Sequence, residues 1–186
     1  MRRFINSIPM ALTLSRILMI PAFIALYMTG FSLWALAVFI IASLTDALDG
    51  YAARKLGLES DLGSLLDPLA DKILVVSALV LFVTGDLVPA WSVILILARE
   101  FSVTGLRSIA AAKGVVIAAG ITGKLKTIFQ MSAIILILFN MWLDNYIFGF
   151  SAIVIYWLAV VLTVASGIEY FVRNRAAYMG NGKENR

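Results

Sequence analysis

The sequence contains no cysteine and no histidine among its 186 residues. Without cysteine the chain can form neither a disulfide nor a thiolate nucleophile, and without both residue types it cannot build a Cys/His zinc site. Imidazole general bases are excluded for the same reason. Proton transfer must therefore fall to Asp, Glu, Lys or Tyr, and a bound metal ion must be one that prefers oxygen ligands.

Proline and charge are also scarce, with four prolines and 14% charged residues, whereas 62% of the chain is hydrophobic. Soluble domains contain about 45–50% apolar residues. The apolar residues fall into long runs that short polar stretches separate. A lone apolar segment satisfies its backbone in lipid only as a helix, so the composition predicts an all-α, polytopic membrane protein.

Six of these runs approach the roughly 20 residues that a helix needs to cross the hydrocarbon core. We predict spans at about 9–29, 33–54, 65–84, 88–112, 121–140 and 150–172. An even number of spans places both termini on the same side of the membrane. No repeat or linker interrupts the chain, so we predict one membrane domain over residues 1–175 and a polar tail over 176–186.

The basic residues are distributed unevenly between the two predicted sides. The connections around 30–32, 85–87 and 141–149 contain no Lys or Arg. The opposite side collects Arg2, Arg3, Arg54, Lys55, Lys113, Lys124, Lys126, Arg173 and Arg175. The positive-inside rule makes this side, and both termini, cytoplasmic. The net charge of +4 therefore reports membrane orientation, and we expect no nucleic-acid partner.

The stretch TDALDGYAARKLGLESDLGSLLDPLADK, residues 45–72, places two pairs of aspartates at helical spacing. Asp46 and Asp49 are three residues apart, and Asp67 and Asp71 are four apart. Residues at these separations share one face of a helix. Because the pairs stand at adjoining ends of consecutive predicted spans, they can converge on one cavity. Four carboxylates repel one another unless cations neutralise them, and an all-oxygen set favours Mg²⁺, Mn²⁺ or Ca²⁺.

Small residues and one arginine accompany the aspartates. Gly50 and Ala53 leave room beside the first pair, and Arg54 supplies a fixed positive charge suited to phosphate oxygens. We expect Gly63 to lie in the loop between the two spans. Together these residues indicate a diphosphate held at the membrane surface. Acidic residues inside membranes also mark ion pathways and interhelix salt bridges, so a divalent-cation transporter is an alternative.

The pattern D-x2-D-G-x2-A-R-x8-G-x3-D-x3-D over residues 46–71 resembles the signature of the CDP-alcohol phosphotransferases. Members of this family are integral membrane enzymes that displace CMP from a CDP-linked lipid or alcohol. The resemblance implies a fold of six transmembrane helices, a homodimer, and an active site that faces the cytoplasm.

The resemblance also assigns roles to individual positions. It implies that two divalent ions, Mg²⁺ or Mn²⁺, are held by Asp46, Asp49, Asp67 and Asp71. Asp71 is in addition the candidate general base toward the acceptor hydroxyl, since the chain has no histidine. Contacts to the CDP group are implied for Gly50, Ala53 and Arg54.

Four basic residues in the fourth and fifth predicted spans indicate the acceptor. Arg99 and Arg107 are eight residues apart and can share one helix face, while Lys124 and Lys126 open the next span. Arginines in an apolar helix need anionic partners, and Glu100 can satisfy only some of them. We predict that these four residues hold a phosphate of the acceptor, with Arg107 and Lys124 foremost. For the two lysines, membrane topology with snorkelling is an alternative.

Three further segments resemble the bacterial phosphatidylglycerophosphate synthase branch of the family. They are LAREFSVTGLRSIAAAKG, GITGKLKT and the pattern IP-x2-LT-x2-R from Ile8 to Arg16, with Met10 where that branch usually has Asn. The resemblance implies CDP-diacylglycerol and sn-glycerol 3-phosphate as substrates. Inositol phosphate stays open as an acceptor because it would need the same basic residues, whereas a serine-using enzyme would not need them.

Overall fold

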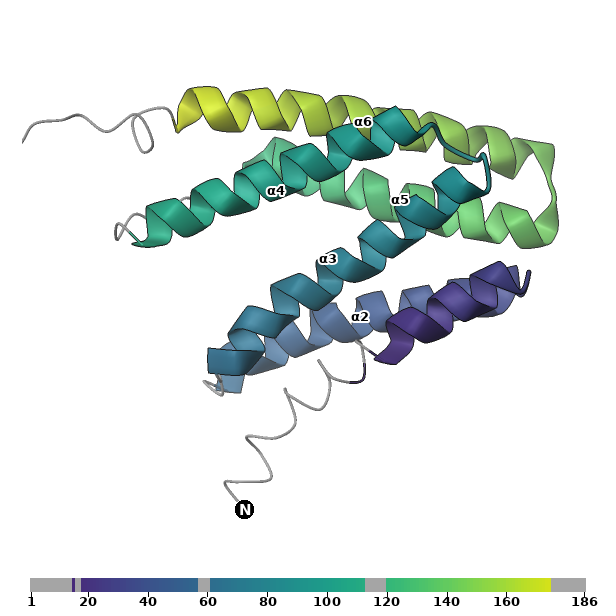
Figure 1. Cartoon of the computed structure of the whole chain (residues 1–186), viewed down its shortest axis with the longest axis horizontal. Coiled ribbons are helices and arrows are strands. Elements are labelled where there is room, and N and C mark those ends of the chain that lie inside the picture. Colours follow the sequence, from purple (N-terminus) through teal and green to yellow (C-terminus); the bar gives the residue numbers. More distant parts are fainter. Residues whose placement is uncertain (1–14, 16–17, 57–60, 113–119, 175–186) are drawn as a thin grey trace, which may run out of the picture.

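The computed structural model describes residue 15 and residues 18–56, 61–112 and 120–174, with the backbone alone given for 46–56, 61–71 and 112. Every described element is an α-helix (Figure 1), so the all-α part of the predicted fold class is confirmed. The helices are Leu18–Met28, α2 (Ser32–Leu56), α3 (Asp61–Thr84), α4 (Ala90–Ala112), α5 (Ile121–Leu143) and α6 (Tyr146–Arg173).

Helix α3 begins before its predicted start at residue 65. It begins at Asp61, so Gly63 belongs to the helix, and its predicted place in a loop was wrong. A single glycine in a helix costs only about 1 kcal/mol relative to alanine. The acidic residue in the first turn offsets part of that cost by its interaction with the helix dipole.

The connection between α5 and α6 is much shorter than the predicted 141–149. Only Asp144 and Asn145 separate the two helices, so that prediction was wrong. Asp144 ends α5 in the left-handed conformation, with φ of 48°, and Asn145 caps α6 by accepting a hydrogen bond from the backbone N–H of Ile147 at 2.9 Å. The side chain of Asn140 also accepts from the Asn145 N–H at 3.1 Å. Two polar residues thus form the whole connection.

Two other helices are also followed closely by a residue with positive φ. Gly30 and Asp86 have positive φ, of 81° and 54°, and the N–H of the following residue reaches back to close the preceding helix. Figure 1 shows these two turns and the α5–α6 turn at one end of the bundle, which we call the turn end. The opposite end, called the motif end, holds the last residues of α2, α4 and α6 and the first residues of α3 and α5.

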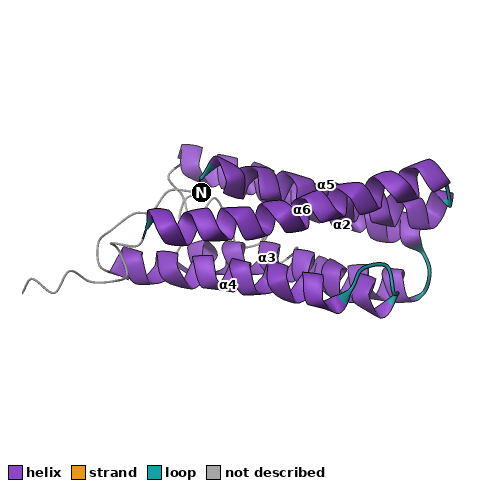
Figure 2. Ribbon diagram, turned by 90° about the horizontal axis from the view of Figure 1, so that it is seen from above, coloured by secondary structure: helices purple, strands orange, loops and turns teal. Residues whose placement is uncertain are grey.

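The helices pack into one bundle (Figures 1 and 2), in which α3 runs obliquely to α6. Helix α5 packs along the full length of α6, while α2 packs on α5 and α4 packs on α6. The core contains large side chains that are fully enclosed, among them Phe23, Phe39, Phe82 and Tyr156. The helices α4 and α6 both run from the turn end to the motif end, so equivalent depths along them face each other.

The outer surface of the bundle carries many large apolar side chains. Trp91, Ile94, Phe150 and Val161 are each more than half exposed. Exposed apolar surface on this scale is typical of contact with membrane or protein rather than water. Helices α5 and α6 are long and apolar enough to cross a membrane, by length and composition. The described parts of α2 and α3 contain the shorter apolar segments Ser32–Thr45 and Lys72–Thr84.

Candidate active site

The aspartate motif lies at the motif end of two adjoining helices. Asp46 and Asp49 are in the last part of α2, and Asp67 and Asp71 are in the first part of α3. The side chains of all four aspartates, and of Gly50, Ala53 and Arg54, lie outside the described part of the chain. Four carboxylates are a donor set that fits a hard divalent cation. Among the side chains that are described, no group of three or more His, Cys, Asp or Glu could hold a metal ion.

The basic residues predicted to bind the acceptor come to the same end of the bundle. Arg99 lies near the middle of α4, Arg107 lies in its second half, and Lys124 and Lys126 lie in the first turns of α5. The up-and-down topology of the bundle therefore brings Arg107 and the two lysines toward the end where the aspartates lie. The N-terminal residues Ile8, Pro9, Leu12, Thr13 and Arg16 lie outside the described residues.

Glu100 is the central residue of a charged cluster between α4 and α5. Its Oε1 atom accepts a hydrogen bond from Arg99 Nη1 at 3.1 Å and another from the Lys126 ammonium group. Lys126 is only 3% exposed. A buried ammonium group requires a charged partner, and the shared carboxylate supplies it. The cluster of Arg99, Glu100 and Lys126 keeps one net positive charge.

The guanidinium group of Arg99 occupies a slot that two glycines form. A Cβ atom on Gly123 of α5 would lie 3.3 Å from Arg99 Nη2, and one on Gly167 of α6 would lie 3.2 Å from Arg99 Cγ. Both distances are shorter than ordinary van der Waals contact. Glycine at these two positions therefore allows the arginine side chain to pass between the helices toward the start of α5.

Arg107 also packs against α6, about one turn beyond Gly167. Its guanidinium carbon lies 5.6 Å from the centre of the Tyr170 ring, within the range of a cation–π interaction. Three buried side-chain atoms have no hydrogen-bond partner in the described part of the chain: Arg99 Nε, Arg107 Nε and Tyr170 Oη. All three belong to the α4–α6 interface near the motif end. Native proteins pair nearly all such atoms, so this local concentration indicates a ligand.

A second carboxylate, that of Glu169 on α6, bonds to the first turn of α5. Thr122 Oγ1 donates a hydrogen bond of 2.6 Å to Glu169 Oε2, and Arg173 Nη1 lies 3.8 Å from Glu169 Oε1. This contact fixes the start of α5, where Lys124 stands. Lys124 itself is exposed, and the structure does not bring it into the cluster around Glu100.

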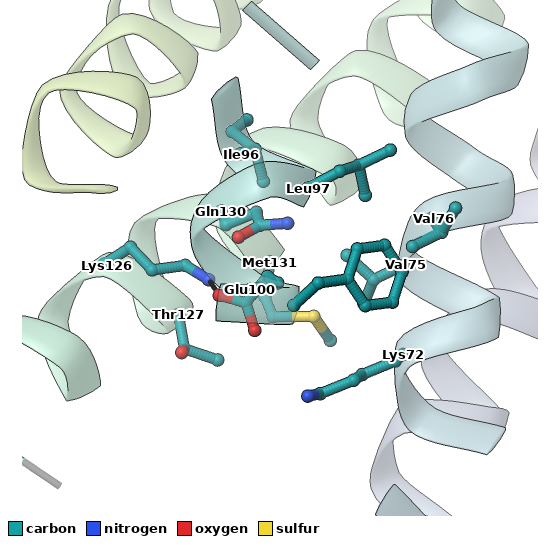
Figure 3. A pocket seen from close by; sticks show the side chains of 11 residues that line it. Lys72, Val75, Val76, Ile96, Leu97, Glu100, Lys126, Thr127, Gln130 and Met131 are labelled. Atoms are coloured by element: carbon teal, nitrogen blue, oxygen red, sulfur yellow. Dashed lines mark hydrogen bonds and ion pairs between the residues drawn. The ribbon is translucent and has the colours of Figure 1, made fainter. Parts of the chain in front are cut away.

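A cavity of about 90 Å³ lies between α3, α4 and α5 (Figure 3). Glu100, Lys126 and Gln130 line it on one side, and Lys72 reaches toward it from α3, next in sequence to Asp71. The ammonium group of Lys72 also donates a hydrogen bond to Thr104 Oγ1 on α4. Apolar residues complete the wall: Val75, Val76, Ile96, Leu97, Phe101 and Met131. The charged cluster therefore faces a space that begins one residue from the aspartate motif.

Comparison with known proteins identifies the family. Residues 6–165 match the CDP-alcohol phosphatidyltransferase family over most of the chain. The chain belongs to this family. The resemblance predicted from the motif is thereby confirmed, and with it the assignment to membrane-embedded, metal-dependent enzymes.

Several phosphatidyltransferases resemble the chain over nearly its whole length. A CDP-diacylglycerol–glycerol-3-phosphate 3-phosphatidyltransferase of Bacillus subtilis (strain 168) is 45% identical over 184 residues, covering 90% of this chain and 95% of that protein. Proteins of the same name from Rickettsia prowazekii (strain Madrid E) and Wigglesworthia glossinidia brevipalpis are 38% and 35% identical, each over 173 residues. These alignments cover 91% and 89% of this chain and 96% and 93% of those proteins.

The structure reveals residues at the candidate site of this phosphatidyltransferase that the sequence alone did not predict. Gly123 and Gly167 were not predicted, because nothing in a single sequence indicates which arginine a glycine accommodates. Tyr170 was missed because a tyrosine near the end of an apolar helix is typical of a membrane interface. Glu100 was recognised only as a partial partner of the arginines, and its contact with Lys126 joins the consecutive helices α4 and α5.

Proposed function

We propose that this chain transfers the phosphatidyl group of CDP-diacylglycerol to sn-glycerol 3-phosphate, giving phosphatidylglycerol phosphate and CMP. The observation that carries the proposal is the 45% identity, over 90% of the chain, to a relative that bears the name of this activity. The unpaired arginine donors at the motif end support a phosphorylated acceptor in particular.

Asp71 acts as the general base in the proposed reaction. It takes the proton of the primary hydroxyl of glycerol 3-phosphate as that oxygen attacks the lipid-side phosphorus. The bond between this phosphorus and the bridging oxygen of the diphosphate breaks, and CMP leaves with the electron pair. A carboxylate is the available base because the chain has no histidine. The rest of the catalysis is positioning and charge neutralisation.

The donor set is suited to two divalent ions, Mg²⁺ or Mn²⁺, held by Asp46, Asp49, Asp67 and Asp71. When bound, such ions neutralise the diphosphate and stabilise the leaving CMP. Gly50, Ala53 and Arg54 contact the CDP group, the glycine and alanine by leaving room and the arginine by pairing with phosphate oxygens.

The acceptor phosphate is held by Arg99, Arg107, Lys124 and Lys126. The buried Nε–H groups of Arg99 and Arg107 have no partner among the described residues, so they are the donors that an arriving phosphate satisfies directly. Lys126 already pairs with Glu100 and contributes charge beside the cavity. Lys124 is exposed on the first turns of α5, from which its long side chain can reach an anion.

The protein resides in the cell membrane with six spans, both termini in the cytoplasm and an active site that faces the cytoplasm. This orientation follows the positive-inside bias, with the aspartates and basic residues at the motif end. The membrane domain covers residues 1–175 and the polar tail 176–186. A homodimer is the proposed assembly, by analogy with the family.

Release of CMP by the purified, full-length chain tests the proposed function. The protein in detergent is supplied with CDP-diacylglycerol, with Mg²⁺ or Mn²⁺, and with glycerol 3-phosphate, inositol phosphate, serine or no acceptor. We expect metal-dependent release with glycerol 3-phosphate alone. Release with a different acceptor would refute the acceptor assignment, and metal flux into vesicles without CMP release would favour a cation transporter.

A further inference from the structure

The interface between α4 and α6 contains polar atoms that the protein itself leaves without a hydrogen bond in its described part. Within the described part of the chain, the buried side-chain atoms that lack a hydrogen-bond partner are Arg99 Nε, Arg107 Nε and Tyr170 Oη. Arg99 contacts α6 at Gly167, and Arg107 stacks on the ring of Tyr170, three residues later. Residues three apart lie on one helix face, so Gly167 and Tyr170 present one face of α6 to the two arginines of α4.

Tyr170 is the least expected member of this group. It is 7% exposed, and a phenol hydroxyl buried to this extent normally finds a partner. Leaving such a hydroxyl unpaired lowers stability, and phenylalanine at this position would avoid that cost. The Tyr170 hydroxyl is therefore available to form a hydrogen bond with a ligand.

We propose that the Tyr170 hydroxyl is a further ligand of the phosphorylated acceptor, donating a hydrogen bond to a phosphate oxygen beside Arg107. This inference rests on the proposed function, since it names another residue of the same acceptor site. The neighbouring donors favour an anion over any other ligand, because both unpaired nitrogens belong to guanidinium groups that carry permanent positive charge.

The ring and the hydroxyl of Tyr170 have separate tasks in this arrangement. The ring lies under the Arg107 guanidinium group at 5.6 Å and restricts where that group can point. The hydroxyl contributes a neutral donor that adds affinity without adding charge. A phosphate held by two arginines and a phenol is bound through geometry as well as through electrostatics.

A second buried tyrosine of α6 provides the control for this proposal. Tyr156 is 1% exposed, and its hydroxyl shares a hydrogen bond of 2.5 Å with Ser92 of α4 at the turn end. The two tyrosines therefore occupy the same helix and face the same neighbouring helix. They differ in that one hydroxyl is paired within the protein and the other is not.

The test compares Tyr170→Phe with Tyr156→Phe in the full-length enzyme. We expect Tyr170→Phe to raise the KM for glycerol 3-phosphate about tenfold, as expected for the loss of one hydrogen bond to a charged group, and to change the KM for CDP-diacylglycerol less than about twofold. Its unfolding temperature without ligand should stay the same or rise. Tyr156→Phe should lower the unfolding temperature and leave both KM values unchanged.

Binding of glycerol 3-phosphate is measured in parallel by the rise in unfolding temperature that the ligand causes. A smaller rise in Tyr170→Phe than in the unmodified protein supports the proposal even if turnover uses another acceptor, so the two failures are distinguishable. An unchanged acceptor KM and an unchanged ligand-induced rise in Tyr170→Phe would overturn the inference. A ligand-free protein destabilised by Tyr170→Phe would also overturn it, because the hydroxyl would then have a partner within the protein.

Discussion

The two ends of the α4–α6 interface satisfy their polar groups differently. At the turn end, Ser92 and Tyr156 are both buried and bond to each other. At the motif end, Arg107 stacks on Tyr170, yet the Nε–H of the arginine and the hydroxyl of the tyrosine have no partner among the described residues. The same pair of helices thus contains one complete polar contact and one incomplete one.

We interpret this difference as a division of roles, in which the polar contact at the turn end stabilises the fold and the polar groups at the motif end bind substrate. A paired buried polar group contributes to stability, whereas an unpaired one lowers it. Short turns and capped helix ends close the turn end. At this end the hydroxyl groups of Ser92 and Tyr156 bond to each other. At the motif end, two arginine Nε–H groups have no partner among the described residues, and the aspartates of the family motif lie at the same end. The site that we propose for substrate therefore coincides with a part of the fold that carries a local cost.

Removing the charge of an aspartate should have a large effect on turnover at the motif end and none at the turn end. Asp71→Asn at the motif end should abolish CMP release while binding of CDP-diacylglycerol stays detectable, because the base is lost and the pocket is kept. Asp144→Asn at the turn end should leave turnover unchanged, since asparagine tolerates the left-handed conformation that Asp144 adopts. An inactive Asp144→Asn enzyme would mean that the ends have been assigned the wrong way round.

Arginines at the motif end should differ according to their burial. Arg107→Ala should raise the KM for glycerol 3-phosphate about 100-fold, the cost of removing a buried charged donor from a phosphate, with far less effect on the KM for CDP-diacylglycerol. Arg173→Ala, which removes an exposed arginine whose only described ion pair is with Glu169 at 3.8 Å, should stay near normal in both. Equal increases in the two KM values for Arg107→Ala would count against its role as a phosphate ligand.

The charged cluster around Glu100 should couple stability to acceptor binding. Lys126→Met leaves Glu100 with Arg99 as its described partner and removes one cation from the cavity. We expect an acceptor KM raised about tenfold and a lower unfolding temperature, because a partly buried carboxylate loses a charged partner. The double variant Glu100→Gln/Lys126→Met should recover part of the stability but not the KM. Full recovery of both would show that the pair is purely structural.

The smallest expected effect concerns the slot for Arg99. Gly167→Ala places a Cβ atom 3.2 Å from Arg99 Cγ, so the arginine must shift and the acceptor KM should rise about threefold. Gly105→Ala on α4 meets nothing within 4 Å and should leave the KM unchanged, with a slight gain in stability from helix propensity. Identical kinetics for the two variants would argue against a role for the slot.

The sequence predicted the fold class and the family well because both depend on strong, local signals. Apolar runs and the spacing of the aspartates from Asp46 to Asp71 are visible without any tertiary contact. The ends of the helices were less well predicted, since capping by Asn145 and the left-handed Asp144 shorten a turn that hydropathy alone reads as a loop. The partners of the basic residues could not be predicted, because contacts between helices depend on tertiary packing, as the contact between Lys126 of α5 and Glu100 of α4 shows.

An experimental structure of the protein with glycerol 3-phosphate bound would show where the acceptor phosphate lies. We expect the phosphate at the α4–α6 interface, within hydrogen-bond distance of Arg99 Nε and Arg107 Nε, with its glycerol directed toward the aspartates of α2 and α3. A phosphate bound at the turn end, or held only by Lys72 and Lys126 in the cavity between α3, α4 and α5 while both arginine donors stay unpaired, would contradict it.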